Sequence, residues 1–311
     1  MTVSGFLSRL EGVKRSGGGW IARCPAHDDH NPSLSIAEGK GQRIMVKCHA
    51  GCSYDNIIAA LGLRPSDLFQ QKAERRKGSP PSQDLTPEQK RGRWPRFENP
   101  TPLELHRIGE LRNIGEDGLR LAVKRGLLRC ADYKSERCWL VTDEARFNAQ
   151  ARRLDGQPFK HDGTDKKTLT LPGSKASWPV GLNEIEPFHN VMLVEGGPDL
   201  LAAHQFITVE ECDVDCCAVA VLGASQLLSK SVLARFTGKH VRIFPHVDAS
   251  GRKAAVEWAR ALLPVAAHVD VFSFDGLRRL DEQPVNDLND LCSIHADDFE
   301  TEKELWNLCP A

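Results

Sequence analysis

Two stretches that share one order of elements constrain the fold of this chain most. Val191–Leu201 (VMLVEGGPDLL) is an apolar run of strand composition that ends at Glu195, followed by a Gly-Gly-Pro turn and an apolar segment that begins at Asp199. Val241–Gly251 (VRIFPHVDASG) repeats the order, with a short strand, a polar loop that contains Asp248, and the start of a helix. Ligands of open α/β sheets bind beyond the carboxyl ends of the strands. We therefore expect these three acids to meet at one edge of a sheet.

Residues 191–280 alternate between strand-like and helix-like segments. The predicted strands are Val191–Val194, Ala218–Leu222, Val241–Phe244 and Val269–Phe274, and the predicted helices are Leu200–Phe206, Leu227–Phe236 and Lys253–Leu263. Such alternation implies an α/β fold with a mainly parallel sheet, right-handed crossovers and flanking helices. Carboxylates crowded at its edge repel one another and are held most readily by a hard divalent cation, usually Mg²⁺.

The composition is that of a soluble protein. Of 311 residues, 41% are apolar, and no apolar run approaches the roughly 18 residues that a membrane span needs. The N-terminus lacks the apolar core of a signal peptide, so we expect a cytoplasmic protein with no membrane partner. In that compartment the ten cysteines favour metal ligation over a disulfide framework.

The net charge of −1 argues neither for nor against nucleic acid, but its distribution is uneven. Residues 71–99 contain eight Lys/Arg against four Asp/Glu, and residues 100–182 contain fifteen against eleven. A basic middle region suits a protein that contacts phosphate there and binds metal elsewhere. Ordinary solvated charge explains the same distribution equally well.

Residues 1–69 are predicted to form a small β-rich domain with two pairs of potential metal ligands. A C-x-x-H pair is followed, after twenty residues, by a C-x-x-x-C pair. Together these pairs supply Cys24, His27, Cys48 and Cys52. Two such pairs on hairpins match the four soft ligands of a structural zinc site, and metal would contribute much of the folding free energy of so small a domain. His30 and His49 also lie within reach, and His49 could replace Cys52; we favour Cys52 because thiolates dominate structural zinc sites.

Two regions of different character lie between the zinc module and the α/β region. Residues 70–100 are predicted to be a flexible linker, because they are rich in Pro, Ser, Gln and charge and have no apolar period. Residues 101–190 are predicted to form a basic α+β subdomain. Its expected helices are Leu103–Leu111 and Asp117–Gly126, and its expected strands are Trp139–Thr142 and Phe147–Leu154.

The last part of this subdomain carries a series of cations. They are Arg152, Arg153, Lys160, Lys166 and Lys167. Arg offers a bidentate fork and Lys a point charge, so this surface could hold a triphosphate or a nucleic-acid backbone. A solvated hairpin is an equally good interpretation of this stretch taken alone.

Residues 281–311 add a polar cluster after the last strand–loop unit. The run PVNDLNDLC places Asp287 where it could fold back to the acidic edge. Capping of a helix by Asp or Asn is the alternative interpretation. Cys212, Cys216 and Cys217 could suggest a second metal site, but no partner pair follows them, so we expect loop or core thiols.

Three motifs of this chain resemble those of one protein family. Glu195-Gly-Gly-Pro-Asp199 and the stretch from His246 through Asp248 to Gly251 look like the two signatures of a TOPRIM domain. CPAHDDHNPSLSI…VKCHAGCS resembles the CHC2-like zinc-binding domain of bacterial (DnaG-type) primases, and ARRLDG…KKTLTLPGS is similar to the basic motif that precedes TOPRIM there. The motifs occur in the family's order over about two-thirds of the chain. Their variant spellings resemble primases of phages, plasmids or prophages more than the housekeeping enzyme.

The resemblance implies a DNA-directed RNA polymerase that makes short primers from NTPs on a single-stranded DNA template. It also implies a structural zinc ion, a catalytic Mg²⁺ or Mn²⁺, and a separate replicative helicase as a possible partner. By position, the catalytic acids are Glu195, Asp199, Asp248 and Asp287. The residues that would bind the divalent metal are Glu195, His246, Asp248 and Asp287. Arg153 and Lys167 match the basic motif. His246 stands where the family has Asp, which predicts a shift towards Mn²⁺ or weak activity, because neutral His binds Mg²⁺ poorly.

Two alternatives remain open at this stage. A TOPRIM nuclease or strand-passage relative would use the same acids, but the zinc module and the basic motif count against it. A non-catalytic DNA-binding protein for replication control would keep the fold without the catalytic metal, and His246 is the residue that favours it.

Overall fold

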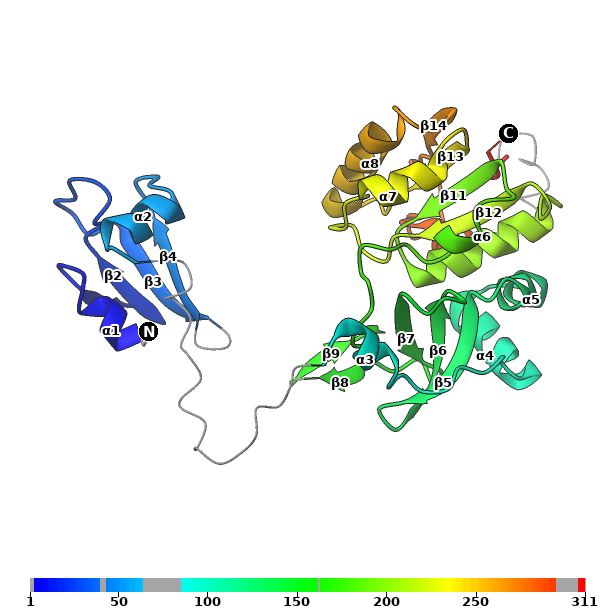
Figure 1. The fold of residues 1–311 in the computed structure, drawn as a ribbon, viewed down its shortest axis with the longest axis horizontal. Helices are drawn as coiled ribbons and strands as arrows, with labels where there is room; N and C mark the ends of the chain where they lie inside the picture. Colours follow the sequence, from blue (N-terminus) through cyan, green and yellow to red (C-terminus); the bar gives the residue numbers. More distant parts are fainter. Residues whose placement is uncertain (1–2, 40–42, 64–84, 162, 295–306, 311) are drawn as a thin grey trace. The chain divides into compact units, whose positions relative to one another are not determined.

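The computed structural model describes residues 3–39, 43–63, 85–161, 163–294 and 307–310. The chain divides into two compact units, residues 1–83 and 84–311, and each is described by itself (Figure 1). Among the described residues, no helix combines the length and the apolar character that a bilayer crossing requires.

The N-terminal unit is built on a four-stranded antiparallel sheet. Its strands follow chain order: β1 (Lys14–Ser16), β2 (Gly19–Ala22), β3 (Leu34–Gly39) and β4 (Arg43–Cys48). Two short helices, α1 (Val3–Leu7) and α2 (Tyr54–Ala60), contribute Phe6 and Ile57 to its buried core. At Gly19 a Cβ would lie 2.3 Å from the carbonyl oxygen of Ile36, so only glycine lets β2 approach β3 this closely. The unit has the β-rich character that its sequence predicts.

The C-terminal unit begins with helices and an antiparallel sheet. The helices are α3 (Pro87–Arg91), α4 (Pro102–Arg112) and α5 (Glu116–Lys124). The sheet contains, in spatial order, β10 (Leu169–Thr170), β7 (Ala149–Arg153), β6 (Glu136–Thr142) and β5 (Leu128–Tyr133), and a separate hairpin joins β8 (Phe159–His161) to β9 (Thr164–Lys166). The two predicted helices and two predicted strands are present with shifted ends, whereas β5, β8, β9 and β10 were not predicted.

The predicted linker is shorter at its C-terminal end than the sequence suggests. Residues 70–84 lie outside the described residues, but residues 85–100 belong to the C-terminal unit. Trp94 is buried and donates its indole N–H to the carbonyl of Pro172 at 2.7 Å, and Glu98 forms a β-bridge with Cys130. The reason is that one buried aromatic anchor and a strand-like bridge fix this segment although its average composition is polar.

A parallel sheet forms the rest of the unit. Its order is β12 (Cys216–Ala220), β11 (Asn190–Val194), β13 (His240–Phe244) and β14 (His268–Val271), with every pairing parallel. The connecting helices are α6 (Gly197–Val209), α7 (Lys230–Leu233), α8 (Ala249–Leu262) and α9 (Leu288–Leu291), with 3₁₀ turns η2 (Leu182–Glu184) and η3 (Ala234–Phe236). The predicted parallel α/β sheet is confirmed. The helix predicted at Leu227–Phe236 is shorter, because its last turn tightens into η3.

Side chains of the central strands alternate between two apolar cores. Leu193 and Ile243 pack with Trp258 of α8 in one core, whereas Met192 and Val194 pack with α6 and the antiparallel part in the other. Strands that are covered on both faces have continuous apolar sequences, and for this reason these strands could be predicted from the sequence. The same burial fixes where the strands end, and so positions the loops at their carboxyl edge.

Candidate functional site

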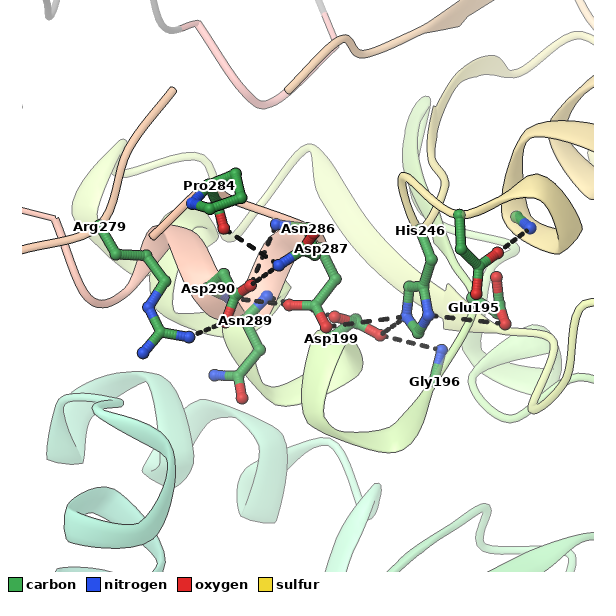
Figure 2. Close-up of polar contacts among 12 residues, drawn as sticks. Glu195, Gly196, Asp199, His246, Arg279, Pro284, Asn286, Asp287, Asn289 and Asp290 are labelled. Carbon is green, nitrogen blue, oxygen red and sulfur yellow. Dashed lines mark hydrogen bonds and ion pairs between the residues drawn. The ribbon is translucent and has the colours of Figure 1, made fainter. Parts of the chain in front are cut away.

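Polar side chains from three separate segments of the chain meet beyond the carboxyl ends of β11 and β13. The register pairs Val194 with Phe244, so the loops after both strands start at the same level. One ligand atom each of Asp199, His246 and Asp287 lies within 4.8 Å of the others, a grouping that could hold a metal ion. We call these three residues the acidic cluster (Figure 2).

His246 occupies the centre of this arrangement. Its Nε2 lies 3.0 Å from Asp199 Oδ2 and 4.0 Å from Asp287 Oδ2, and its Nδ1 lies 3.7 Å from Glu195 Oε1 (Figure 2). Burial by itself lowers the pKa of His246. The hydrogen bond to Asp199 and the charges of Asp199, Glu195 and Asp287 outweigh burial and raise that pKa to about 9. Without a metal, a protonated imidazole therefore balances the carboxylates at neutral pH.

Local structure fixes the two carboxylates of the cluster. Asp199, in the first turn of α6, is 2% exposed and accepts the backbone N–H of Gly196 at 3.1 Å and of Asn289 at 3.2 Å. Asp287 caps α9 by accepting the N–H of Asp290 at 2.8 Å through Oδ1. Its other oxygen faces His246, so capping and a place in the cluster are compatible. Burial and the charge of Asp199 raise the pKa of Asp287 to about 7.

Glu195 lies directly after β11 and borders the cluster. Its side chain is 14% exposed, and its Oε2 atom is buried without a hydrogen-bond partner among the described residues. Burial, assisted by the charges of Asp199 and Asp248, raises its pKa. A buried acceptor without a donor calls for an explanation, and a cation is one that fits the carboxylates around it.

Asp248 caps a helix and lies outside the acidic cluster. Its Oδ1 accepts the N–H of Gly251 at 2.7 Å and caps α8, and it lies outside the group of atoms that meet within 4.8 Å. At Gly251 a Cβ would lie 2.2 Å from the carbonyl oxygen of His246, so glycine allows the loop to fold against the helix. Val247 then donates its N–H to the carbonyl of Asn286 at 2.8 Å, which ties this loop to the one that carries Asp287. A role of Asp248 as a metal ligand stays a prediction.

Two arginines in the antiparallel part of the C-terminal unit interact electrostatically with Asp199 and Asp287 of the acidic cluster. Arg152 of β7 and Arg112 at the end of α4 lie over the Trp139 ring, 5.9 and 5.7 Å from its centroid. Burial and the neighbouring Arg112 lower the pKa of Arg152 to about 10, and the charges of Asp199 and Asp287 oppose this. Burial likewise lowers the pKa of Arg112, and the charges of Asp287 and Asp199 again oppose this effect. Arg112 Nε is buried without a partner among the described residues, so the guanidinium retains a donor for an anion.

The other predicted cations do not join Arg152. Arg153 is the next residue on the strand and therefore projects to the opposite face, where it pairs with Glu136 at 2.7 Å and with Asp155. Lys160 pairs with Asp165 at 2.7 Å on the exposed hairpin. Lys166 and Lys167 are exposed. Arg112 was missed by sequence reasoning, because only tertiary packing brings the end of α4 to Trp139.

The four predicted zinc ligands meet in the N-terminal unit. Ligand atoms of Cys24, His27, Cys48 and Cys52 all lie within 4.8 Å of one another, and we call them the zinc cluster. His27 Nδ1 lies 3.2 Å from Cys52 Sγ and 3.9 Å from Cys48 Sγ. His49 points elsewhere, with its Nε2 at 2.8 Å from the hydroxyl of Ser35. The donor set fits a tetrahedral zinc ion, with Cys52 rather than His49 as the fourth ligand.

Asp29 organises the zinc cluster without belonging to it. One carboxylate oxygen accepts the backbone N–H of Cys24 at 2.7 Å and two bonds from Ser33, and the other lies 3.8 Å from His27 Nε2. The hydroxyl of Ser33 and the other hydrogen bonds hold the pKa of Asp29 at about 2. A carboxylate behind a ligating imidazole sets the orientation of that ring and raises its basicity. Nothing in the spacing of the zinc ligands indicates this role of Asp29.

Comparison with known proteins gives similarities to solved structures of primases. No family model and no curated protein matches the chain. The primase fragment of the bacteriophage T7 primase–helicase protein is 15% identical with a TM-score of 0.42, and the match covers 89% of this chain and 94% of that one. The zinc-binding and RNA polymerase domains of the Aquifex aeolicus primase are 16% identical with a TM-score of 0.36, covering 99% and 83%. A chain from a bacteriophage T7 complex of the lagging-strand DNA polymerase with primase domains, RNA/DNA hybrid and dTTP is 19% identical with a TM-score of 0.42, covering 70% and 94%. All three similarities have an identity below 20% and a TM-score below 0.5.

Proposed function

We propose that this chain is a DNA primase of the TOPRIM type, which joins NTPs into short RNA primers on single-stranded DNA. The observation that carries the proposal is the acidic cluster at the carboxyl edge of a parallel sheet, together with the half-buried Arg112 and Arg152, whose pKa values its charges influence. Carboxylates for a divalent metal and guanidinium groups for phosphate are the two requirements of nucleotidyl transfer. The three sequence motifs that resemble primases support the same assignment.

Each group at the acidic edge has a distinct task in this proposal. Asp199, Asp287, Glu195 and His246 would hold the divalent metal, with Asp248 beside them. When bound, this metal supplies Lewis-acid polarisation of the triphosphate and lowers the pKa of the primer 3′ hydroxyl. Arg112 and Arg152 bind the triphosphate oxygens, for which the guanidinium fork offers bidentate hydrogen bonds. Their partial burial strengthens this attraction, because solvent screens it less than at an exposed site.

His246 regulates how the metal enters. The proton that it shares with Asp199 must leave before its nitrogen can act as a ligand, so metal binding releases a proton. The donor set of carboxylates plus one imidazole suits Mn²⁺ better than Mg²⁺. A preference for Mn²⁺ therefore belongs to the proposal.

The zinc cluster and the basic hairpin complete the assignment. The zinc module would contact the template, with its ion in a structural role. Exposed Lys160, Lys166 and Lys167 would contact the nucleic-acid backbone, whereas Arg153, which pairs with two acids, would support the strand. The motif spellings favour a primase of a phage, plasmid or prophage that works with a separate replicative helicase in the cytoplasm.

A primer-synthesis assay tests the proposal. The full chain is incubated with single-stranded DNA, labelled NTPs and either Mg²⁺ or Mn²⁺, beside Glu195→Gln and Asp248→Asn. We expect short labelled RNA that is more abundant with Mn²⁺, that Glu195→Gln abolishes, and that Asp248→Asn reduces. DNA shortening without NTPs would instead identify a nuclease.

A second candidate, a non-catalytic DNA-binding protein, is favoured by one observation. His246 already neutralises the cluster through its contact with Asp199, as a bound cation would. In this case no primer forms with either metal on varied templates, and DNA binding is retained in Glu195→Gln.

A further inference from the structure

Three cysteines meet beside the parallel sheet, two of them close together in sequence and the third far from both. Cys212 follows α6, Cys216 begins β12, and Cys309 lies in the C-terminal segment Asn307–Pro310, which runs next to the sheet (Figure 1). Their three Sγ atoms lie within 4.8 Å of one another. Sequence reasoning found no partner pair for the first two cysteines, because the third ligand is 93 residues after Cys216.

The position of Cys309 is fixed by contacts that do not involve its sulfur. The N–H groups of Leu308 and Cys309 donate to the two carboxylate oxygens of Glu210 at 2.8 and 2.9 Å. Arg242 donates to the carbonyl of Asn307, and Leu308 is fully buried in the apolar core. The backbone therefore brings this thiol to the other two.

A disulfide accounts for only part of this arrangement. Cys212 and Cys309 are paired as a disulfide in the structure, which leaves Cys216 as a third sulfur in contact with the pair. The Cα atoms of the pair are 7.2 Å apart, beyond the roughly 4.4–6.8 Å that disulfides usually span. A thiophilic cation would use all three sulfurs, since tetrahedral Zn–S bonds of about 2.3 Å place neighbouring sulfurs roughly 3.8 Å apart.

The surroundings suit a charged metal–thiolate group. Arg125 donates to the carbonyls of Asp213 at 2.7 Å and of Cys216 at 2.9 Å. Its Nη1 atom is buried and has no hydrogen-bond partner among the described residues. Three thiolates around a divalent ion carry one net negative charge, and the guanidinium next to Cys216 offsets it. Cys216 and Cys309 are buried, whereas Cys212 is half-buried, so the group of sulfurs borders solvent on the side of Cys212.

We propose that Cys212, Cys216 and Cys309 bind a second zinc ion, with a water molecule as the fourth ligand. This site is separate from the zinc cluster of the N-terminal unit and from the acidic cluster. Its effect is to attach the C-terminal segment to the sheet through β12, and it holds whether or not the chain synthesises primers.

Zinc content of the full chain, prepared with reductant and excess zinc and then desalted, tests this proposal. We expect two zinc ions per chain in the wild type and one in Cys309→Ser, which alters a residue near the chain end. Cys217→Ser is the matched control, because Cys217 is equally buried on the other face of β12, and it should retain two. One zinc ion in the wild type, unchanged in Cys309→Ser, would overturn the proposal.

Cobalt provides a readout that does not depend on the first site. In the double variant Cys48→Ser, Cys52→Ser, the site at β12 should still give thiolate-to-Co²⁺ charge-transfer absorption. Adding Cys309→Ser should remove that absorption. A double variant that binds Co²⁺ without a thiolate band, with Cys212 and Cys309 recovered as a disulfide, would contradict a metal site.

Discussion

The zinc cluster and the acidic cluster are both candidate metal centres, but their scaffolds differ. The zinc cluster takes its ligands from two short pairs within residues 24–52 of a small unit. The acidic cluster takes its groups from loops up to 88 residues apart, each positioned by a strand or helix of a larger buried core. The first centre should depend on its metal for folding. The second should exist before metal arrives, since its charges are already balanced by His246.

The largest effect is expected from removing a zinc ligand. Cys48→Ser should unfold the N-terminal unit, because structural zinc contributes roughly 10–16 kcal/mol in comparably small domains. The C-terminal unit should stay folded. Limited proteolysis would detect selective cleavage within the described residues 43–63. Cys138→Ser, which removes a buried thiol outside the zinc cluster and the acidic cluster, should leave those residues as protected as in the wild type. If the N-terminal unit of Cys48→Ser were as resistant to protease as that of the wild type, the zinc cluster would not be needed for folding, and the contrast with the acidic cluster would be wrong.

Loss of the Asp199 charge should weaken metal binding strongly without unfolding the chain. Asp199→Asn keeps an acceptor for Gly196 but removes a charge, so Mn²⁺ affinity should fall by roughly 100-fold, about 3 kcal/mol. Electron paramagnetic resonance measures free Mn²⁺ during a titration. The matched control is Asp290→Asn, since Asp290 pairs with Arg279 at 3.1 Å and lies outside the cluster. A similar loss of Mn²⁺ affinity in both variants would show that Mn²⁺ does not bind specifically at the acidic cluster.

Adjacent arginines should differ in their effect on nucleotide binding. Arg152→Lys removes a fork that faces the acidic cluster and should raise KM for NTPs by about tenfold, as expected for one charged hydrogen bond of about 1.5 kcal/mol. Arg153→Lys alters the opposite face and should leave KM unchanged. Steady-state kinetics with varied NTP would separate them, and a larger KM increase in Arg153→Lys would favour the motif-based assignment over strand geometry.

The two centres should respond to pH in opposite directions. In metal-free protein, the pKa of His246 is raised from 6.5 to about 9, so its stabilisation is complete below about 6.5 and is lost as pH rises through 9. The pKa of Asp287 is raised from 3.8 to about 7, so stability is also lost as pH rises between these values. Each effect is of order 1–3 kcal/mol. The zinc cluster should instead lose stability as pH falls, because protons displace zinc from thiolates.

Urea unfolding of the C-terminal unit in EDTA, followed from about pH 5 to pH 9, measures this dependence. His246→Gln should remove the decline above neutral pH and keep the decline below it. A stability that rises with pH in the wild type would mean that the carboxylates are not buried as described.

Local patterns predicted the parts of the fold that depend on neighbours in sequence. The pairs at Cys24 and Cys48 identified the zinc cluster because each pair lies on one turn. The continuous apolar strands identified the parallel sheet. The strand-end rule predicted that Glu195, Asp199 and Asp248 meet at one edge, and of these three Asp199 belongs to the acidic cluster. These inferences needed only spacing and periodicity.

Features set by long-range packing could not be predicted. Arg112 reaches the site only because α4 packs near Trp139, and Asp29 acquires its role from the fold of one loop. Successive side chains of β7 point to opposite faces of the sheet, so Arg152 and Arg153 lie on different faces. The basic motif, as a continuous stretch of sequence, does not show on which face each arginine lies. The buried side chain of Trp94 anchors residues 85–100 to the C-terminal unit, although the composition of this segment is polar.

Primer synthesis by wild type, Asp199→Asn and Asp290→Asn, compared in one assay with Mn²⁺, tests the central claim most directly. The claim is that the acidic cluster is the centre of RNA synthesis. We predict labelled primers from the wild type and Asp290→Asn, and none from Asp199→Asn at equal DNA binding. Undiminished synthesis by Asp199→Asn would contradict the account.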